Sequence, residues 1–352
     1  PRRDPRAGDT DPVSAPRAPD AGPRRRVVVL ATGGTIASEG STPTQVVGYS
    51  RPALSPDALI ASAPSIATVA DVRAEQLFQV LSGHLTVANW LALSRRASEL
   101  LARDDVDGIA ITHGTDALEE TAYWLTLTVR SEKPIVLTGA MRPASALSAD
   151  GPMNLYNAVA LAASSAAVGM GALVAMNDAI HAARDATKMR TSSPDAFDSP
   201  EFGRLGRMQG GAAHFHRRPL RRHTIASEFD VRSLDSLPRV DITYGHTGAT
   251  RVPIDALVAA GARGIVNAGV GQGDVTPDVL AGLDDARRAG VHVVRTSRVP
   301  GGTVVANGAI RDDEHDFVAA DTLNPQKARV LLMLALTATD DRREIQRIFD
   351  QY

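Results

Sequence analysis

The chain has 352 residues, a length that suggests two domains, and its 43% apolar and 22% charged residues are typical of a globular protein. Its 38 basic and 40 acidic residues give a net charge of −2, which offers no excess of positive charge to nucleic acids or anionic membranes. Cysteine is absent, which excludes disulfides, Cys-ligated metals and a thiol nucleophile, and no apolar run approaches the roughly 18 residues that span a bilayer.

Residues 1–26 differ in composition from the rest of the chain. They are rich in Pro, Arg, Asp and Ala, and Val13 is the only large apolar residue before the end of this segment. Such a segment cannot bury enough apolar surface to offset the entropy lost on ordering, so we predict a disordered tail. Its mixture of Arg and Asp argues against a polybasic membrane anchor.

From residue 27 onward, short apolar runs rich in β-branched residues alternate with helical patterns. Strands are predicted at 27–31, 108–112, 134–138, 172–176, 264–267 and 291–295. Helices are predicted at 86–103, 117–129, 154–167, 253–261, 277–289 and 325–337. Continuous apolar strands that alternate with helices indicate an α/β protein with mostly parallel sheets.

Strand signals fade between about residue 179 and residue 240, where Pro, Gly, His and Arg gather. We therefore predict a linker at 216–236. It would separate a large N-terminal domain with a mostly parallel sheet, 27–215, from a smaller C-terminal α/β domain, 237–352.

Two glycine-containing turns are the first candidates for chemistry, because ligands of parallel α/β sheets bind beyond the carboxyl ends of the strands. The turn at 32–37 contains Thr35, and the turn at 113–116 contains Thr115 and Asp116. Glycines let a ligand approach the backbone, and exposed N–H groups can stabilise an oxyanion. The first turn is also compatible with a phosphate-binding loop or a plain turn, although it lacks a nucleotide-binding motif. Asp116, three residues before Glu119, is also compatible with a helix cap.

Lysine usage gives a third candidate. The 38 basic residues are 35 arginines and only three lysines, Lys133, Lys188 and Lys327. Lys188 follows the predicted strand 172–176, and an amine at that place could release a proton, which arginine cannot do. A surface cation is the alternative interpretation. The Gly-rich loop 269–273 could bind a ligand or form a flexible turn.

Other catalytic classes lack their motifs. His214 and His216 have no further ligands nearby in sequence, so we expect no metal site. The chain has neither the His-Glu-x-x-His motif of zinc proteases nor the Gly-x-Ser-x-Gly motif of α/β-hydrolases.

Four segments in the same order resemble the bacterial L-asparaginase family, in particular its type II enzymes. They are 31–37, 111–122, 139–155 and 323–329, and the resemblance extends from about residue 26 to Tyr352. It implies hydrolysis of L-asparagine to L-aspartate and ammonia, with weaker glutaminase activity allowed and no cofactor. It also implies a homotetramer of close dimers whose sites are completed across an interface.

The resemblance implies a role for each residue that matches the family's motifs. Thr35 would attack the side-chain amide and form an acyl-enzyme, with Tyr49 helping to activate it. Thr115, Asp116 and Lys188 would form a second triad that handles protons and the attacking water, and Thr115 and Asp116 would also contact the substrate.

The implied substrate-binding set also includes Ser82, Gly83 and Gln272. Three positions depart from the type II pattern. Gly83 replaces a glutamine and leaves only a backbone contact, Gln272 stands where Asn or Ser is common, and Ala309 aligns near an acidic residue that reaches in from a neighbouring subunit. We therefore expect weaker substrate binding, and hence a higher Michaelis constant, than in relatives with the full set.

Two other functions remain as alternatives. One is a related amidase or a transamidation subunit acting on charged tRNA, and the other is an inert amino-acid-binding protein. A small-molecule substrate without nucleic-acid or membrane partners fits the charge balance better. The type II resemblance and the absence of an initial Met favour a periplasmic or secreted protein, with the cytoplasm as the alternative.

Overall fold

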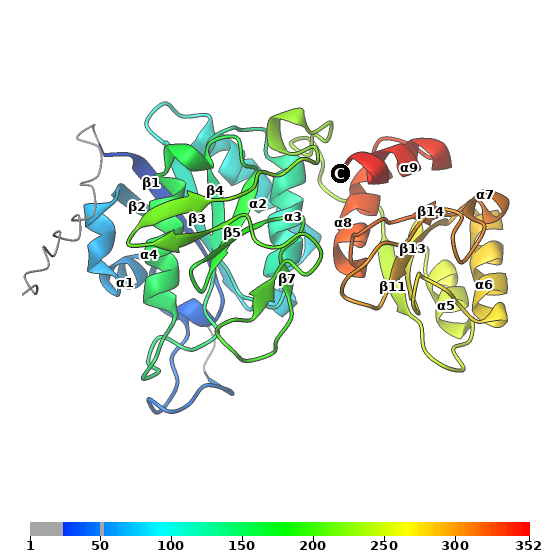
Figure 1. The fold of residues 1–352 in the computed structure, drawn as a ribbon, viewed down its shortest axis with the longest axis horizontal. Helices are drawn as coiled ribbons and strands as arrows, with labels where there is room; N and C mark the ends of the chain where they lie inside the picture. Colours follow the sequence, from blue (N-terminus) through cyan, green and yellow to red (C-terminus); the bar gives the residue numbers. More distant parts are fainter. Residues whose placement is uncertain (1–23, 50–52) are drawn as a thin grey trace, which may run out of the picture.

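The computed structural model describes residues 24–49 and 53–352, and it contains two main sheets with helices packed on both (Figure 1). The predicted tail lies outside these residues except for residues 24–26, and Arg26 already begins the first strand. No helix in the described ranges has both the length and the apolar character needed to span a lipid bilayer.

The large sheet has eight strands in the described part of the chain, in the order β10-β9-β6-β5-β4-β3-β1-β2. The five strands from β5 to β2 run parallel, and β6, β9 and β10 extend the sheet in antiparallel fashion. Their bounds are β1 Arg26–Gly33, β2 Asp71–Val80, β3 Gly108–Thr112, β4 Ile135–Thr138, β5 Ala172–Met176, β6 Ala179–Ala182, β9 Gly206–Gln209 and β10 Ala212–Phe215.

Helices cover both faces of this sheet. The face formed by Val28 and Leu30 packs on α2 and α3, and the face formed by Val27 and Val29 packs on α1 and α4. These helices are α1 Pro56–Ala61, α2 Val87–Leu101, α3 Leu118–Thr128 and α4 Gly151–Ala162. Short 3₁₀ turns occur at η1 Thr35–Ala37, η2 Pro64–Thr68, η3 Ser82–His84, η4 Ser165–Ala167 and η5 Thr224–Ala226.

The small sheet is parallel, with the order β11-β12-β13-β14. Its elements are β11 Val240–Tyr244, α5 Val252–Ala259, β12 Gly264–Gly269, α6 Pro277–Arg288, β13 His292–Ser297, α7 Asp312–His315, β14 Val318–Ala319, α8 Pro325–Ala335 and α9 Arg342–Gln351. The predicted fold class, a large mostly parallel domain followed by a smaller α/β domain, is confirmed. The predicted linker 216–236 lies between β10 and β11 and carries only η5.

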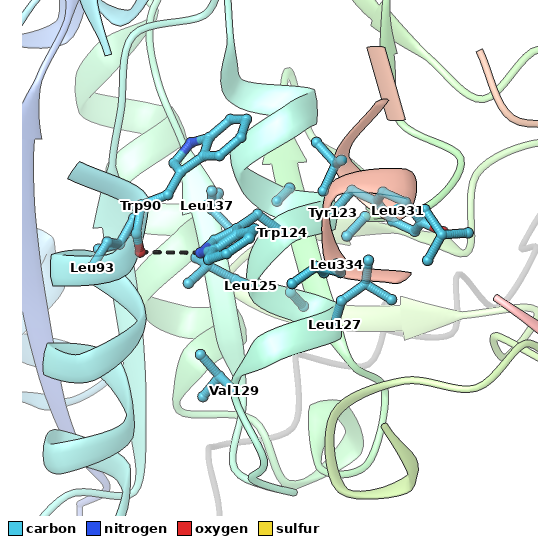
Figure 2. Close-up of a cluster of buried hydrophobic side chains, with 14 of the residues drawn as sticks. Trp90, Leu93, Tyr123, Trp124, Leu125, Leu127, Val129, Leu137, Leu331 and Leu334 are labelled. Carbon is cyan, nitrogen blue, oxygen red and sulfur yellow. Dashed lines mark hydrogen bonds between the residues drawn. The ribbon is translucent and has the colours of Figure 1, made fainter. Parts of the chain in front are cut away.

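One apolar core joins the two sheets. Leu331 and Leu334 of α8 belong to the same buried cluster as Leu127 of α3, and α8 also packs on the small sheet. Figure 2 shows α3 between α2 and α8, with the rings of Trp90 and Trp124 stacked at 5.5 Å. Because this core is continuous between the two sheets, it does not mark a domain boundary. The domain limits 27–215 and 237–352 therefore remain a proposal.

Candidate active site

Glycines bring three turns together at the carboxyl ends of β1, β2 and β3. Gly34 has a φ of 85°, and a Cβ atom on it would lie 2.4 Å from the backbone nitrogen of Gly114. A Cβ atom on Gly114 would in turn lie 2.6 Å from the hydroxyl oxygen of Ser82. Only residues without side chains fit at these two positions. The turns that carry Thr35 and Thr115 are therefore in direct backbone contact.

Thr35 begins η1 directly after β1, and its side chain faces Tyr49. The two hydroxyl oxygens lie 2.8 Å apart, and either can donate the hydrogen bond. Both residues are half-buried, whereas most of the segment 39–49 that carries Tyr49 is exposed. The arrangement allows a proton to pass directly between the two hydroxyl groups.

A second group of side chains surrounds Lys188. Its Nζ donates to Thr115 Oγ1 at 2.9 Å and to Asp116 Oδ1 at 2.6 Å. The Lys188 side chain is 16% exposed, so the surface-cation interpretation is wrong. Asp116 is 74% exposed, and its backbone N–H donates to the Ser82 hydroxyl at 3.1 Å. One amine, two hydroxyls and one carboxylate therefore converge at the end of β3.

A buried carboxylate that the sequence reasoning did not assign fixes the backbone of Lys188. Lys188 lies in β7 (Thr187–Lys188), paired with β8 (Phe197–Asp198), and its N–H donates to Glu119 Oε2 at 2.8 Å. The other oxygen of Glu119 accepts from the side chain of Asn324 at 3.3 Å. The helix-cap interpretation of Asp116 and Glu119 is therefore wrong: α3 begins at Leu118 without a side-chain cap.

Lys327, at the start of α8, is a second missed positioning residue. Its amine is fully enclosed and donates to the carbonyl of Ala186, two residues before Lys188, at 2.5 Å. Burial lowers the pKa of Lys327 to about 8. Two sequence signals pointed to Lys327, the scarcity of lysine and its place in the motif 323–329, but neither showed that its amine would be enclosed.

The remaining predicted site residues are divided between the two domains. Gly83 has open space where a side chain would stand, and it lines a cavity of about 220 Å³ together with Ser82 and Asp116. Gln272 is exposed in the loop after β12, where its carbonyl accepts from Arg295 at 3.0 Å. Among the described residues, Gln272 makes no hydrogen bond to either threonine.

The chain matches known proteins over nearly all of its length. The family profile "Asparaginase, N-terminal" matches residues 26–221, and "Glutaminase/Asparaginase C-terminal domain" matches residues 239–349. The chain belongs to the asparaginase family. This confirms the resemblance that the four motifs predicted.

Three relatives illustrate the asparaginase match. The chain is 47% identical to a glutaminase-asparaginase of Pseudomonas fluorescens biotype A, over 93% of this chain and 90% of the relative. It is 46% identical to a probable periplasmic L-asparaginase of Haemophilus influenzae, over 93% of each chain. The crystal structure of a probable cytoplasmic L-asparaginase from Campylobacter jejuni superposes with a TM-score of 0.91 at 44% identity, over 94% of this chain and all of that one.

Glu120 is, after Lys327, a second ionisable group near the site whose pKa is shifted by burial. Its carboxylate lines the cavity beside Ser82 and Asp116, and the nearest cation, Arg329 of α8, lies 3.9 Å away. Burial raises the pKa of Glu120 to about 7, against the opposing effect of Arg329. The carboxyl group therefore takes up a proton near neutral pH.

The pH dependence of stability should reveal this group. The pKa of Glu120 is about 7 in the folded state against 4.5 in an unperturbed Glu, so the folded chain binds the proton more tightly. Protonated Glu120 therefore contributes free energy of unfolding that is fully present below pH 4.5 and is lost as the pH rises toward 7. Glu120→Gln should therefore gain about 1–3 kcal/mol of unfolding free energy relative to the wild type between pH 4.5 and 7. Urea unfolding of both proteins at pH 4.5 and pH 7 measures the gain. The prediction would be contradicted if the free energies of unfolding of the variant and the wild type changed equally with pH.

Proposed function

We propose that this protein is an amidohydrolase that converts L-asparagine to L-aspartate and ammonia through an acyl-enzyme on Thr35, with weaker activity on glutamine. The contacts of Lys188 with Thr115 and Asp116 carry the proposal. The amine of Lys188 contacts one threonine hydroxyl, and Tyr49 contacts the other. Acyl transfer needs such groups to move protons, whereas binding of an amino acid alone does not. Relatives described as a glutaminase-asparaginase and an L-asparaginase support the same substrate class.

The first half-reaction forms the ester. Thr35 Oγ1 bonds to the carbon of the side-chain amide while its proton moves to the oxygen of Tyr49, and the proton of Tyr49 moves to the leaving nitrogen. The carbon–nitrogen bond then breaks and ammonia departs. Backbone N–H groups of the turns 32–37 and 113–116 stabilise the negative charge that develops on the amide oxygen.

The second half-reaction hydrolyses the ester. Water attacks the ester carbon while Thr115 Oγ1 takes a proton from it and passes its own proton to the neutral amine of Lys188. The bond between the ester carbon and Thr35 Oγ1 then breaks, the Thr35 oxygen takes a proton from Tyr49, and Tyr49 recovers one from Lys188 through water as aspartate leaves. Acid–base help of this kind contributes a factor of about 10²–10⁴ in rate. Every step uses groups of the chain and water, so the proposed reaction requires no cofactor.

The substrate's own charges would be recognised beside Lys188. We assign the α-ammonium of asparagine to the carboxylate of Asp116, which is accessible to solvent. The α-carboxylate is assigned to the hydroxyl of Ser82 and to the backbone of Gly83, and the hydroxyl of Thr115 borders the reacting amide. The open space at Gly83 supports the expectation of weak binding, because no side chain there contacts the substrate.

We further propose that the chain assembles as a homotetramer in which Gln272 of one copy completes the site of another. The exposure of Gln272, and the lack of any hydrogen bond between it and Thr35 or Thr115 among the described residues, support a contact made between copies. The net charge of −2 does not oppose association.

For the location, we propose the periplasm or secretion, with the cytoplasm as the alternative. The likeness to a relative described as periplasmic supports the first. The likeness to one described as cytoplasmic supports the second.

Ammonia release from L-asparagine and L-glutamine, measured side by side, tests the proposed activity. Asparagine should give the higher kcat/KM. Substrate binding without ammonia release would favour the inert amino-acid-binding protein. Activity confined to aminoacyl-tRNA, together with retardation of tRNA at low salt, would favour the transamidation subunit.

A further inference from the structure

A second cavity lies beside α3, and neither Thr35 nor Thr115 lines it. It encloses about 340 Å³ between α3, β5 and the segment 217–223 of the linker. Its inner wall is apolar and fully buried, and it includes Met170, Ala172 and Leu205. None of the residues assigned to catalysis or to substrate binding lines this cavity.

Tyr123 forms part of the buried wall of this cavity. Its side chain is 1% exposed within the buried cluster of Figure 2, and it also lines the cavity. Its hydroxyl has no hydrogen-bond partner among the described residues. Buried hydroxyl groups are nearly always paired. Burial also raises the pKa of Tyr123, so the hydroxyl stays neutral inside the cavity wall.

The rim of the cavity is positively charged. Arg217, Arg218 and Arg222 are exposed, and their guanidinium groups make no hydrogen bond or ion pair within residues 24–49 and 53–352. Asp185 is the only acidic side chain among the lining residues, and it lies 3.6 Å from Arg184. The charge at the opening therefore favours an anion.

We propose that this cavity binds a small organic anion with an apolar body. The apolar body would fill the space against Met170, Ala172 and Leu205. The carboxylate or sulfonate group would lie at Arg217 and Arg222. Two large apolar side chains at the opening, Phe202 (45% exposed) and Leu220 (98% exposed), would be covered by such a ligand. The site does not depend on the proposed hydrolase activity, because it shares no residue with it.

The aromatic sulfonate 8-anilinonaphthalene-1-sulfonate is a suitable probe, because its emission rises in apolar surroundings. We expect saturable binding to the folded protein. The double variant Arg217→Gln/Arg222→Gln should weaken the affinity about tenfold, since two charge-assisted contacts are lost. Tyr123→Phe should bind the probe like the wild type and should not lower the melting temperature, because the hydroxyl that it removes is buried in the wall and unpaired.

Arg130→Gln/Arg343→Gln is the matched control. These two arginines are also exposed, and their guanidinium groups also make no hydrogen bond or ion pair within 4 Å among the described residues, but they do not line the cavity. The control should bind the probe like the wild type. Equal affinity in all variants, or displacement of the probe by L-aspartate, would overturn the proposal, because the probe would then occupy another surface or the catalytic site.

Discussion

Replacing Thr35 with alanine is expected to lower kcat for asparagine hydrolysis by roughly 10⁴-fold or more, because no other group forms the ester in the proposed reaction. The hydroxyl of Thr35 lies 2.8 Å from that of Tyr49, so the variant removes the attacking oxygen and leaves its partner in place. Ammonia release under substrate saturation measures the loss. Full activity in Thr35→Ala would refute the assignment of the nucleophile.

Two companion variants separate chemistry from folding. Thr35→Ser keeps a hydroxyl at the same place and should retain measurable activity. Lys188→Met removes the amine that contacts Thr115, and it should lower kcat by about 10²–10⁴. Because the two groups serve one reaction, the double variant Thr35→Ala/Lys188→Met should be hardly slower than Thr35→Ala alone. Circular dichroism establishes that each variant is folded.

Asp312→Ala is expected to lower the free energy of unfolding by about 3–5 kcal/mol, because it leaves Arg295 as an unpaired charge in the interior. Both side chains are 0% exposed, and the guanidinium of Arg295 contacts the two carboxylate oxygens at 2.5 and 2.6 Å. Such a loss is a large part of the roughly 5–15 kcal/mol that stabilises a typical domain. Urea unfolding at neutral pH measures it.

Asp313 provides the matched control beside this pair. Its side chain is 65% exposed and accepts from Arg342 and from Asn307 at 2.8 Å, so Asp313→Ala should change the free energy of unfolding far less than Asp312→Ala. The double variant Arg295→Met/Asp312→Leu should recover much of the loss, since it leaves no buried charge unpaired. An unfolding curve of Asp312→Ala that matches the wild type would show that the pair does not stabilise the fold.

The central strands could be predicted from continuous apolar runs, but the edge strands could not. The predicted runs at 108–112 and 172–176 coincide with β3 and β5, which are buried along their whole length. β2 was missed because it is an edge strand with no fully buried residue, so its composition does not form an apolar run. The helix predicted at 154–167 begins instead at Gly151, because Pro152 occupies the first turn, where its missing N–H costs nothing.

Some residues of the candidate site could likewise be predicted from the sequence, and others could not. Strand-end turns led from the sequence to Thr35 and Thr115, because a parallel sheet brings such turns to one edge. Tyr49 was reachable only through the family resemblance, since nothing in its neighbourhood indicates which hydroxyl it faces. Glu119 and Lys327 act through contacts with residues far away in the chain. A buried ion is not visible in local composition, so their positioning of Lys188 could be found only in the folded structure.

The shared core around α8 restricts how asparagine can reach the site. A clamshell opening of the two domains would expose Leu331 and Leu334 to water, and each fully exposed leucine costs about 1.5–3 kcal/mol. The solvent-facing segment 39–49, which ends at Tyr49, has few buried side chains and can be displaced at much lower cost. If the proposed reaction holds, we therefore expect asparagine to enter past this loop rather than through a hinge, and movement of the loop would carry Tyr49 to and from Thr35.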